Sequence, residues 1–225
     1  MDILNQANTQ TIVMVSHVVP YPPMAGNEYY ICQITKWLES LGYRVILVIC
    51  PLPGDVVSKE RIIKLSGKMT NFFICRRDGS VTYRVANQQG TLALQNELTS
   101  DLEPLLNRFL SKLGFTRWQY LRKTELMFCP LVLVTLMKWL ASQVDPLVII
   151  TNYVWMTRYF SEIGKRPLKM IFTHDVFSTK KKKVLSYGIE DGLALSDQEE
   201  RKYLLRGDVI VAIHPEEAKA LRNLA

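Results

Sequence analysis

The chain contains several continuous runs of apolar residues, separated by stretches in which apolar residues recur at helical spacing. The runs are short and lack the polar alternation of a strand that has one face in water. We therefore expect buried strands, covered by helices on both faces, in a mostly parallel sheet. The runs lie at residues 11–16, 45–49, 147–150, 169–172 and 208–213.

The first run opens a strand–helix–strand unit. A Pro-rich loop follows Ser16 and reaches Gly26, and a helical pattern then runs from Glu28 to Leu41. A second strand is predicted at 44–49, which makes a right-handed βαβ unit with parallel strands. The predicted fold class is a doubly wound α/β sheet, a Rossmann-like arrangement. The helix is expected to bury Tyr30, Ile31, Ile34, Trp37, Leu38 and Leu41.

The rest of the chain continues this alternation of strands and helices. Residues Asp78-Gly79 indicate a two-residue hairpin between two short strands, and Ser196 with Glu199 forms a capping-box pattern that starts a helix. The predicted short strands lie at 71–75 and 81–85, and the predicted helices at 59–65, 92–113, 125–141 and 196–204. We expect a polar tail at 1–10 and one domain at 11–225.

Composition narrows the class of protein. Lysine and arginine number 28 against 21 acidic residues, a net charge of +7, which suits an anionic partner. The four cysteines form no C-x-x-C pair and there are three histidines, so we expect no metal site. Residues 1–10 are polar and 126–141 is too short an apolar stretch to span a bilayer, so a soluble cytoplasmic protein is expected.

The first loop is a candidate binding site. Ligands of such sheets bind beyond the carboxyl ends of the strands, where Ser16, His17 and the loop to Gly26 must lie. The loop has neither a dinucleotide fingerprint nor a P-loop. Gly26 could bring backbone N–H groups close to a phosphate at the helix N-terminus, or it could simply permit a tight turn into the helix.

Three segments resemble one known family. Residues 15–27 with 38–45 resemble the opening of GT-B fold glycosyltransferases, particularly the retaining family-4 group. Residues 172–178 are similar to a strand of that family that ends in a His-Asp pair. Residues 199–213 are similar to its E-x-x-x-x-x-x-A-D-x-V signature, with Gly207 where alanine is usual.

The resemblance implies the acceptor-side, N-terminal half of an enzyme with two Rossmann-like domains. The donor-binding domain would lie beyond Ala225. It implies that His174, with Asp175, acts in catalysis and that the loop at Gly26 and Asn27 contacts the donor diphosphate. Many relatives have two adjacent glycines in this loop, whereas here Ala25 precedes a single one.

Each of these residues also has a structural interpretation. His174 could cap the next segment or be a buried core histidine, and Asp175 could either orient the imidazole or cap the next turn. His17 could be an ordinary loop residue. Tyr153 and Trp155 could stack on a sugar ring or pack in the core. The run Lys180, Lys181, Lys182 and Lys183 could contact an anionic membrane or form a solvated helix face.

The sequence thus predicts the acceptor-binding domain of a glycosyltransferase of bacterial surface polysaccharide assembly. The full enzyme would move a sugar from a nucleotide-sugar donor to a glycan or lipid-linked acceptor, without a metal cofactor, at the inner face of the membrane. This chain alone would be inactive. The alternatives are a non-catalytic module of the same fold and a basic nucleic-acid-binding domain, although no nucleic-acid-binding motif supports the second.

Overall fold

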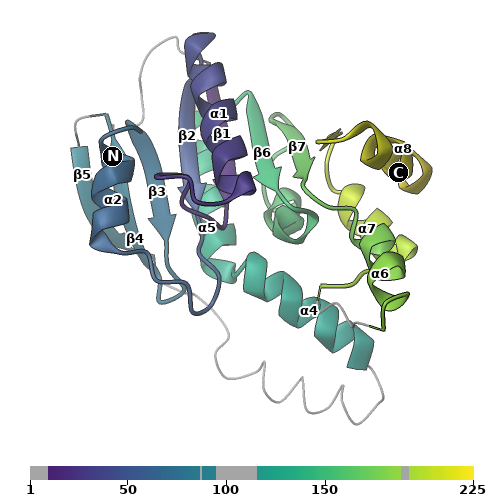
Figure 1. The fold of residues 1–225 in the computed structure, drawn as a ribbon. Coiled ribbons are helices and arrows are strands. Elements are labelled where there is room, and N and C mark those ends of the chain that lie inside the picture. Colours follow the sequence, from purple (N-terminus) through teal and green to yellow (C-terminus); the bar gives the residue numbers. More distant parts are fainter. Residues whose placement is uncertain (1–9, 87, 95–115, 189–192) are drawn as a thin grey trace.

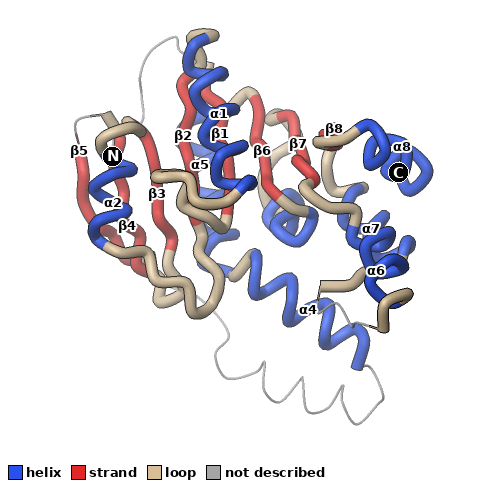
Figure 2. The backbone as a smooth tube through the Cα atoms, viewed as in Figure 1, coloured by secondary structure: helices blue, strands red, loops and turns tan. Residues whose placement is uncertain are grey.

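The computed structural model describes residues 10–86, 88–94, 116–188 and 193–225, which form a sheet with helices on both faces (Figure 1). The strand order is β5-β4-β3-β2-β1-β6-β7-β8, and Figure 2 shows the strands as one layer. All pairs from β3 to β8 are parallel, and the edge pairs β3–β4 and β4–β5 are antiparallel. The strands are β1 Thr11–Ser16, β2 Arg44–Ile49, β3 Asn71–Cys75, β4 Ser80–Val85, β5 Gln88–Ala93, β6 Val148–Asn152, β7 Leu168–Thr173 and β8 Val209–Ala212.

Two hydrophobic clusters separate the layers. Helices α1 and α2 pack on one face of the sheet, in front in Figure 1, and α5 lies on the other face. The second face also receives the 3₁₀ helix η2 and the apolar sides of α7 and α8. The helices are α1 Gly26–Ser40, α2 Lys59–Ser66, α4 Thr116–Phe128, α5 Leu131–Val144, η2 Val154–Ser161, α6 Phe177–Leu185, α7 Asp197–Leu204 and α8 Pro215–Leu224.

The order of the parallel strands confirms the predicted doubly wound α/β fold. From β1 the chain adds β2 and β3 on one side, and it later returns to add β6, β7 and β8 on the other side. The direction in which the chain adds strands therefore reverses between β1 and β6, which is the switch point of the sheet. In folds of this kind the crevice at that switch point, beyond the carboxyl ends of the strands, is where ligands bind.

The predicted buried face of α1 was too wide. Ile31 and Leu38 are buried, but Trp37 and Leu41 are 58% and 55% exposed. The contact face instead includes Thr35, which lies four residues after Ile31 and three before Leu38. The wide apolar stripe thus leaves part of its surface in water.

The predicted helix 125–141 was wrong as one element, because Pro130 divides it into α4 and α5. Proline lacks an N–H group and disfavours helical geometry at the residue before it, here Cys129. Among the described residues no single helix is long and apolar enough to span a membrane, and α4 with α5 meets that test only as a pair bent by 50°.

Other differences lie at the sheet edges. The hairpin between β3 and β4 is present, but its turn has three residues because Arg76 N pairs with Ser80 O at 2.8 Å. The predicted helix 92–113 was wrong at its start, where Leu92 and Ala93 belong to β5, and 95–113 lies outside the described residues. Edge strand β8 is half-buried rather than buried on both faces.

The glycosyltransferase-like signature after α6 has a structural role here. Glu200 is fully buried, and its two carboxylate oxygens accept hydrogen bonds from the backbone N–H groups of Phe177 and Ser178, both at 2.8 Å. These are orphan donors of the first turn of α6. Asp208 accepts from the backbone N–H of Lys169 at 2.9 Å, which holds the start of β8 against β7.

We expect Glu200→Gln to lower the free energy of unfolding by about 2 kcal/mol, because one of two charge-assisted hydrogen bonds is replaced by two facing donors. Urea unfolding followed by circular dichroism measures this change. The matched control is Glu199→Gln, since glutamine also serves at the third position of a capping box. Equal stability of the two variants would contradict the capping role of Glu200.

Candidate functional site

A buried amide joins three strands at the switch point. Asn152, the last residue of β6, is fully buried, and its Nδ2 donates to the carbonyl oxygen of Val15 in β1 at 2.9 Å. Its Oδ1 lies 3.0 Å from Nε2 of His174, which follows β7. Asn152 therefore connects the ends of β1, β6 and β7.

This arrangement defines the tautomer of His174. A carbonyl oxygen only accepts, so the amide nitrogen of Asn152 must face Val15 and its oxygen must face the imidazole. Nε2 of His174 then carries the proton, and Nδ1 keeps its lone pair. Burial lowers the pKa of His174, while Asp175 nearby opposes that shift. The neutral imidazole thus offers an acceptor nitrogen.

Aromatic rings surround this histidine. The Tyr153 ring lies 4.8 Å from the His174 ring and 5.2 Å from the His17 ring, centroid to centroid. Tyr30 of α1 meets His174 edge-on at 5.5 Å, and Phe128 of α4 meets His17 in the same way at 5.5 Å. The structure therefore brings together His17, Tyr153 and His174, three residues that are far apart in the sequence.

The backbone of Tyr153 is strained. Its φ of 71° and ψ of 140° are rare for a residue with a side chain, and such geometry costs on the order of 1–3 kcal/mol. Burial raises the pKa of Tyr153, and a side-chain hydrogen bond with Asn27 opposes that shift. In this conformation the Tyr153 ring contacts both histidines and its hydroxyl bonds to Asn27 of α1.

His17 is held uncharged. Burial lowers its pKa to about 4, although the carboxylates of Asp55 and Glu28 favour the charged form. Its Nδ1 is buried and has no hydrogen-bond partner among the described residues. A buried ring nitrogen without a partner is the kind of group that a bound hydroxyl or water satisfies, since either can donate or accept.

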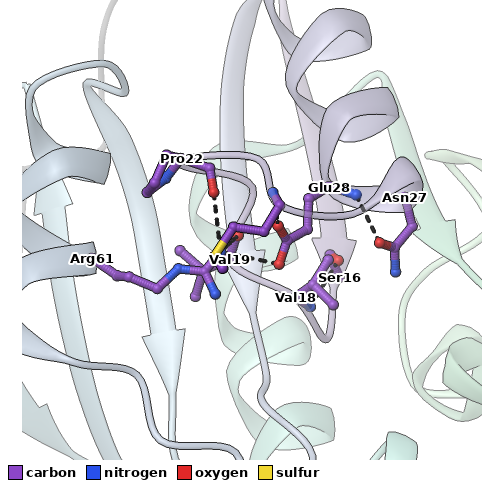
Figure 3. Close-up of polar contacts among 8 residues, drawn as sticks. Ser16, Val18, Val19, Pro22, Asn27, Glu28 and Arg61 are labelled. Carbon is purple, nitrogen blue, oxygen red and sulfur yellow. Dashed lines mark hydrogen bonds and ion pairs between the residues drawn. The ribbon is translucent and has the colours of Figure 1, made fainter.

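An ion pair fixes the loop between β1 and α1, as Figure 3 shows. Arg61 of α2 donates through Nη2 to the carboxylate of Glu28 at 3.0 Å and to the carbonyl oxygen of Val19 at 2.6 Å. It also reaches the carbonyl oxygen of Pro22 at 3.3 Å. The second oxygen of Glu28 accepts from Met24 N at 2.6 Å. The loop is thus held at both its middle and its end.

The N-terminus of α1 lies at the end of this loop. Its N-cap residue, Ala25, makes no side-chain cap, and Asn27 Oδ1 accepts from the N–H of Glu28 at 2.8 Å. Nothing lies within 4 Å of a methyl group placed on Gly26. Packing therefore gives no reason for a glycine at this position, and close approach of a ligand remains an explanation for it.

The other predicted site residues have structural partners. Ser16 is fully buried, and its Oγ accepts from Val18 N at 3.1 Å, so it supports the start of the loop. Asp175 neither bonds to the imidazole nor caps α6, two roles the sequence had left open; it pairs with Lys180 at 3.6 Å. Trp155 is buried in the core.

The lysine run lies along α6. Lys182 pairs with both oxygens of Asp197 at 2.8 and 3.0 Å, and Lys180 pairs with Asp175. Two of the four positive charges therefore have carboxylate partners, while Lys181 is half-buried and Lys183 is exposed. The run carries less free charge than its sequence suggests.

Sequence reasoning missed Asn152, Tyr30 and the Arg61–Glu28 pair. Asn152 gave a usable signal, because a polar residue at the carboxyl end of an apolar strand faces the switch point. The pairing of Arg61 with Glu28 spans 33 positions and left no pattern. In the described part of the chain, no three His, Cys, Asp or Glu side chains are grouped to hold a metal ion.

Comparison with known proteins agrees with the fold. No model of a known protein family matches the chain, and no curated protein sequence does. Among solved structures, a sucrose-phosphate synthase from Thermosynechococcus elongatus superposes with a TM-score of 0.52 at 14% identity, over 95% of this chain. A UDP-glucosyltransferase from Polygonum tinctorium gives 0.37 at 11% identity, over 83% of this chain and 35% of its own.

The chain spans 45% of the length of the sucrose-phosphate synthase structure. At this level of identity the likeness shows a shared fold: the chain has the Rossmann-like α/β architecture of a domain in that enzyme.

We expect the protein to lose stability as the pH falls from about 6.5 to about 4, because the unfolded chain binds a proton at His17 that the folded protein excludes over this range. His17 alone should contribute a loss of about 2 kcal/mol between pH 7.5 and pH 5. Urea unfolding at the two pH values measures it.

The variant His17→Gln should remove this part of the pH dependence, leaving a smaller part from His174. The control His214→Gln changes an exposed histidine at the start of α8 and should keep the full loss. An unchanged pH dependence in His17→Gln would show that the ring is not excluded from protonation.

Proposed function

We propose that this chain is a domain of a glycosyltransferase that moves a sugar from a nucleotide-sugar donor. One observation carries the proposal: the switch point of the sheet holds a neutral, oriented histidine, His174, beside Tyr153 and the N-terminus of α1. The fold shared with sucrose-phosphate synthase supports it. The further proposal of the retaining family-4 group rests on the resemblance of the sequence motifs.

The residues at the switch point suit a sugar substrate. The lone pair at Nδ1 of His174 can accept a hydrogen bond from a sugar hydroxyl, or face the positive charge that develops on the sugar ring at the transition state. Tyr153 and Asn27 add hydroxyl and amide groups next to it. The backbone N–H groups at Gly26 and Asn27 would face the donor phosphates, where the helix dipole favours negative charge.

We assign this chain the acceptor-binding half, with a glycan or lipid-linked acceptor in surface polysaccharide assembly. The donor-binding half would follow Ala225. No cofactor is needed in this scheme, because basic side chains and helix dipoles neutralise the leaving diphosphate. A non-catalytic module of the same fold remains the second candidate, and the same assay separates the two.

In the full-length enzyme, His174→Ala should lower turnover by roughly 10²-fold, the scale of one preorganised transition-state contact. Transfer of radiolabelled sugar from UDP-, GDP- or TDP-sugars to membrane-extracted acceptor measures it. The matched control is His214→Ala, which also follows a strand of the sheet but lies outside the cluster, and it should keep wild-type turnover.

Wild-type turnover in His174→Ala would overturn the catalytic role, and absence of transfer by the wild-type enzyme with every donor would favour the non-catalytic module. The 225-residue chain alone should bind these donors weakly. Micromolar affinity in calorimetry would assign it to the donor side instead.

We further propose that the lysine run on α6 binds anionic membrane, with the protein peripheral to the inner face. Each basic residue near such a surface contributes about 1 kcal/mol. Because Lys180 and Lys182 are paired, we expect weak binding that is lost as salt rises through roughly 0.3 M. Sedimentation with phosphatidylglycerol vesicles measures it.

The variant with Lys180, Lys181, Lys182 and Lys183 changed to glutamine should lose most of this binding. The control with Lys36, Lys59, Lys64 and Lys68 changed to glutamine has the same net charge and should keep it. Equal binding by the two variants would leave the run as a solvated face.

A further inference from the structure

A pocket lies beside the candidate site, at the carboxyl ends of β2 and β3. It measures about 240 Å³, is open to solvent on one side, and is bounded by the loop after β2 and the turn between β3 and β4. The loop starts next to β1, because Cys50 N donates to Ser16 O at 2.8 Å. The carboxylate of Asp55, in the pocket wall, is close enough to His17 to act on its pKa.

Both walls of the pocket are tight turns. In the first, Asp55 N donates to Leu52 O at 3.1 Å, with Pro53 and a left-handed Gly54 at the two central positions. Those residues are typical of a type II turn. In the second, Gly79 N donates to Arg76 O at 3.1 Å. Turns closed in this way give a pocket that exists before a ligand binds.

The two arginines of the pocket differ in what they offer. Arg77 donates through both terminal nitrogens to the carbonyl oxygens of Leu126 and Met127, at the C-terminal end of α4. The positive charge of Arg77 thus stabilises the C-terminal end of α4. Arg76 gives one nitrogen to Thr82 Oγ1 at 2.8 Å, and among the described residues its guanidinium makes no other hydrogen bond, so its other N–H groups can donate to a ligand.

The pocket lining also includes two carboxylates. Asp55 and Asp78 are both exposed, and one oxygen of Asp78 accepts from Ser80 N at 2.8 Å. The pocket lining therefore presents both acceptor oxygens and donor N–H groups, and its two arginines and two aspartates sum to zero charge. Two carboxylates would repel a phosphate or a carboxylate, whereas hydroxyl groups can donate to them. Pro51, Leu52 and Val57 supply apolar walls.

We propose that this pocket binds one uncharged polyhydroxylated ring, a neutral sugar, with Asp55 and Asp78 accepting from its hydroxyls and Arg76 donating to them. The identification of this ring with the acceptor rests on the proposed function. The volume is below the roughly 300–1,000 Å³ of pockets for drug-sized ligands, which limits the occupant to a single ring. The apolar residues pack against the C–H face of that ring.

The test is titration of the 225-residue chain with methyl glycosides of glucose, galactose, mannose and N-acetylglucosamine, followed by amide NMR shifts. We expect at least one to bind in the millimolar range and to shift the amides of 52–57 and 76–80. Glucose 6-phosphate and glucosamine, as charged counterparts, should bind at least fivefold more weakly than the best neutral glycoside.

Asp55→Asn and Arg76→Gln should each weaken binding by fivefold or more. The control Asp145→Asn, at an exposed left-handed position before β6 and so at the amino-terminal ends of the strands, away from the pocket, should bind as wild type does. Preference for the phosphorylated or the amino sugar, shifts elsewhere, or wild-type affinity in both pocket variants would overturn the proposal.

This outcome is separate from that of the proposed function, because no donor or transfer step is involved. If the pocket binds a sugar but the full-length protein transfers none, the pocket proposal stands and the proposed transferase function is overturned. If the full-length protein transfers a sugar but the pocket binds no glycoside, the transferase function stands and the pocket proposal is overturned.

Discussion

The candidate site depends on the buried amide of Asn152. Its two hydrogen bonds, to Val15 O and to His174, join the strands on either side of the switch point. Because one end of the amide must donate to a carbonyl, the other end can only accept, and this fixes which nitrogen of His174 bears the proton. A buried amide left without either partner would cost about 1–3 kcal/mol. The same interaction thus stabilises the sheet and sets the chemistry of the histidine.

The polar residues near the site fall into two groups with different roles. Glu200, Asp208 and the Arg61–Glu28 pair satisfy backbone groups and hold α6, β8 and the first loop. The residues of the second group, His17 and His174 with Tyr153, keep exposed or unsatisfied atoms at the edge of the sheet. The signature residues after α6, Glu200 and Asp208, belong to the first group. The motif therefore indicates the fold and does not by itself identify residues that act in catalysis.

Much of the fold could be read from the sequence because parallel strands buried on both faces leave unbroken apolar runs. The edge strands could not be predicted in this way. Strand β5, Gln88–Ala93, forms through pairing with β4, and its polar, mostly exposed residues show no strand pattern. Histidines at strand ends pointed to the site, since the topology of such sheets places those ends together. Asp175 could not be placed, because its ion pair with Lys180 depends on how α6 leaves the sheet.

The charge state of the site limits which ligands the described residues can hold. His17 and His174 are kept neutral by burial, and Arg61, the cation at the first loop, is engaged by Glu28. Of the described groups at the switch point, the positive end of the α1 dipole is what remains to face a diphosphate, and it is equivalent to about half a charge. A leaving diphosphate needs more compensation than that. The geometry therefore fits a surface that holds a ligand through neutral hydrogen bonds, and the function we propose would need cations from outside the described residues to face the diphosphate.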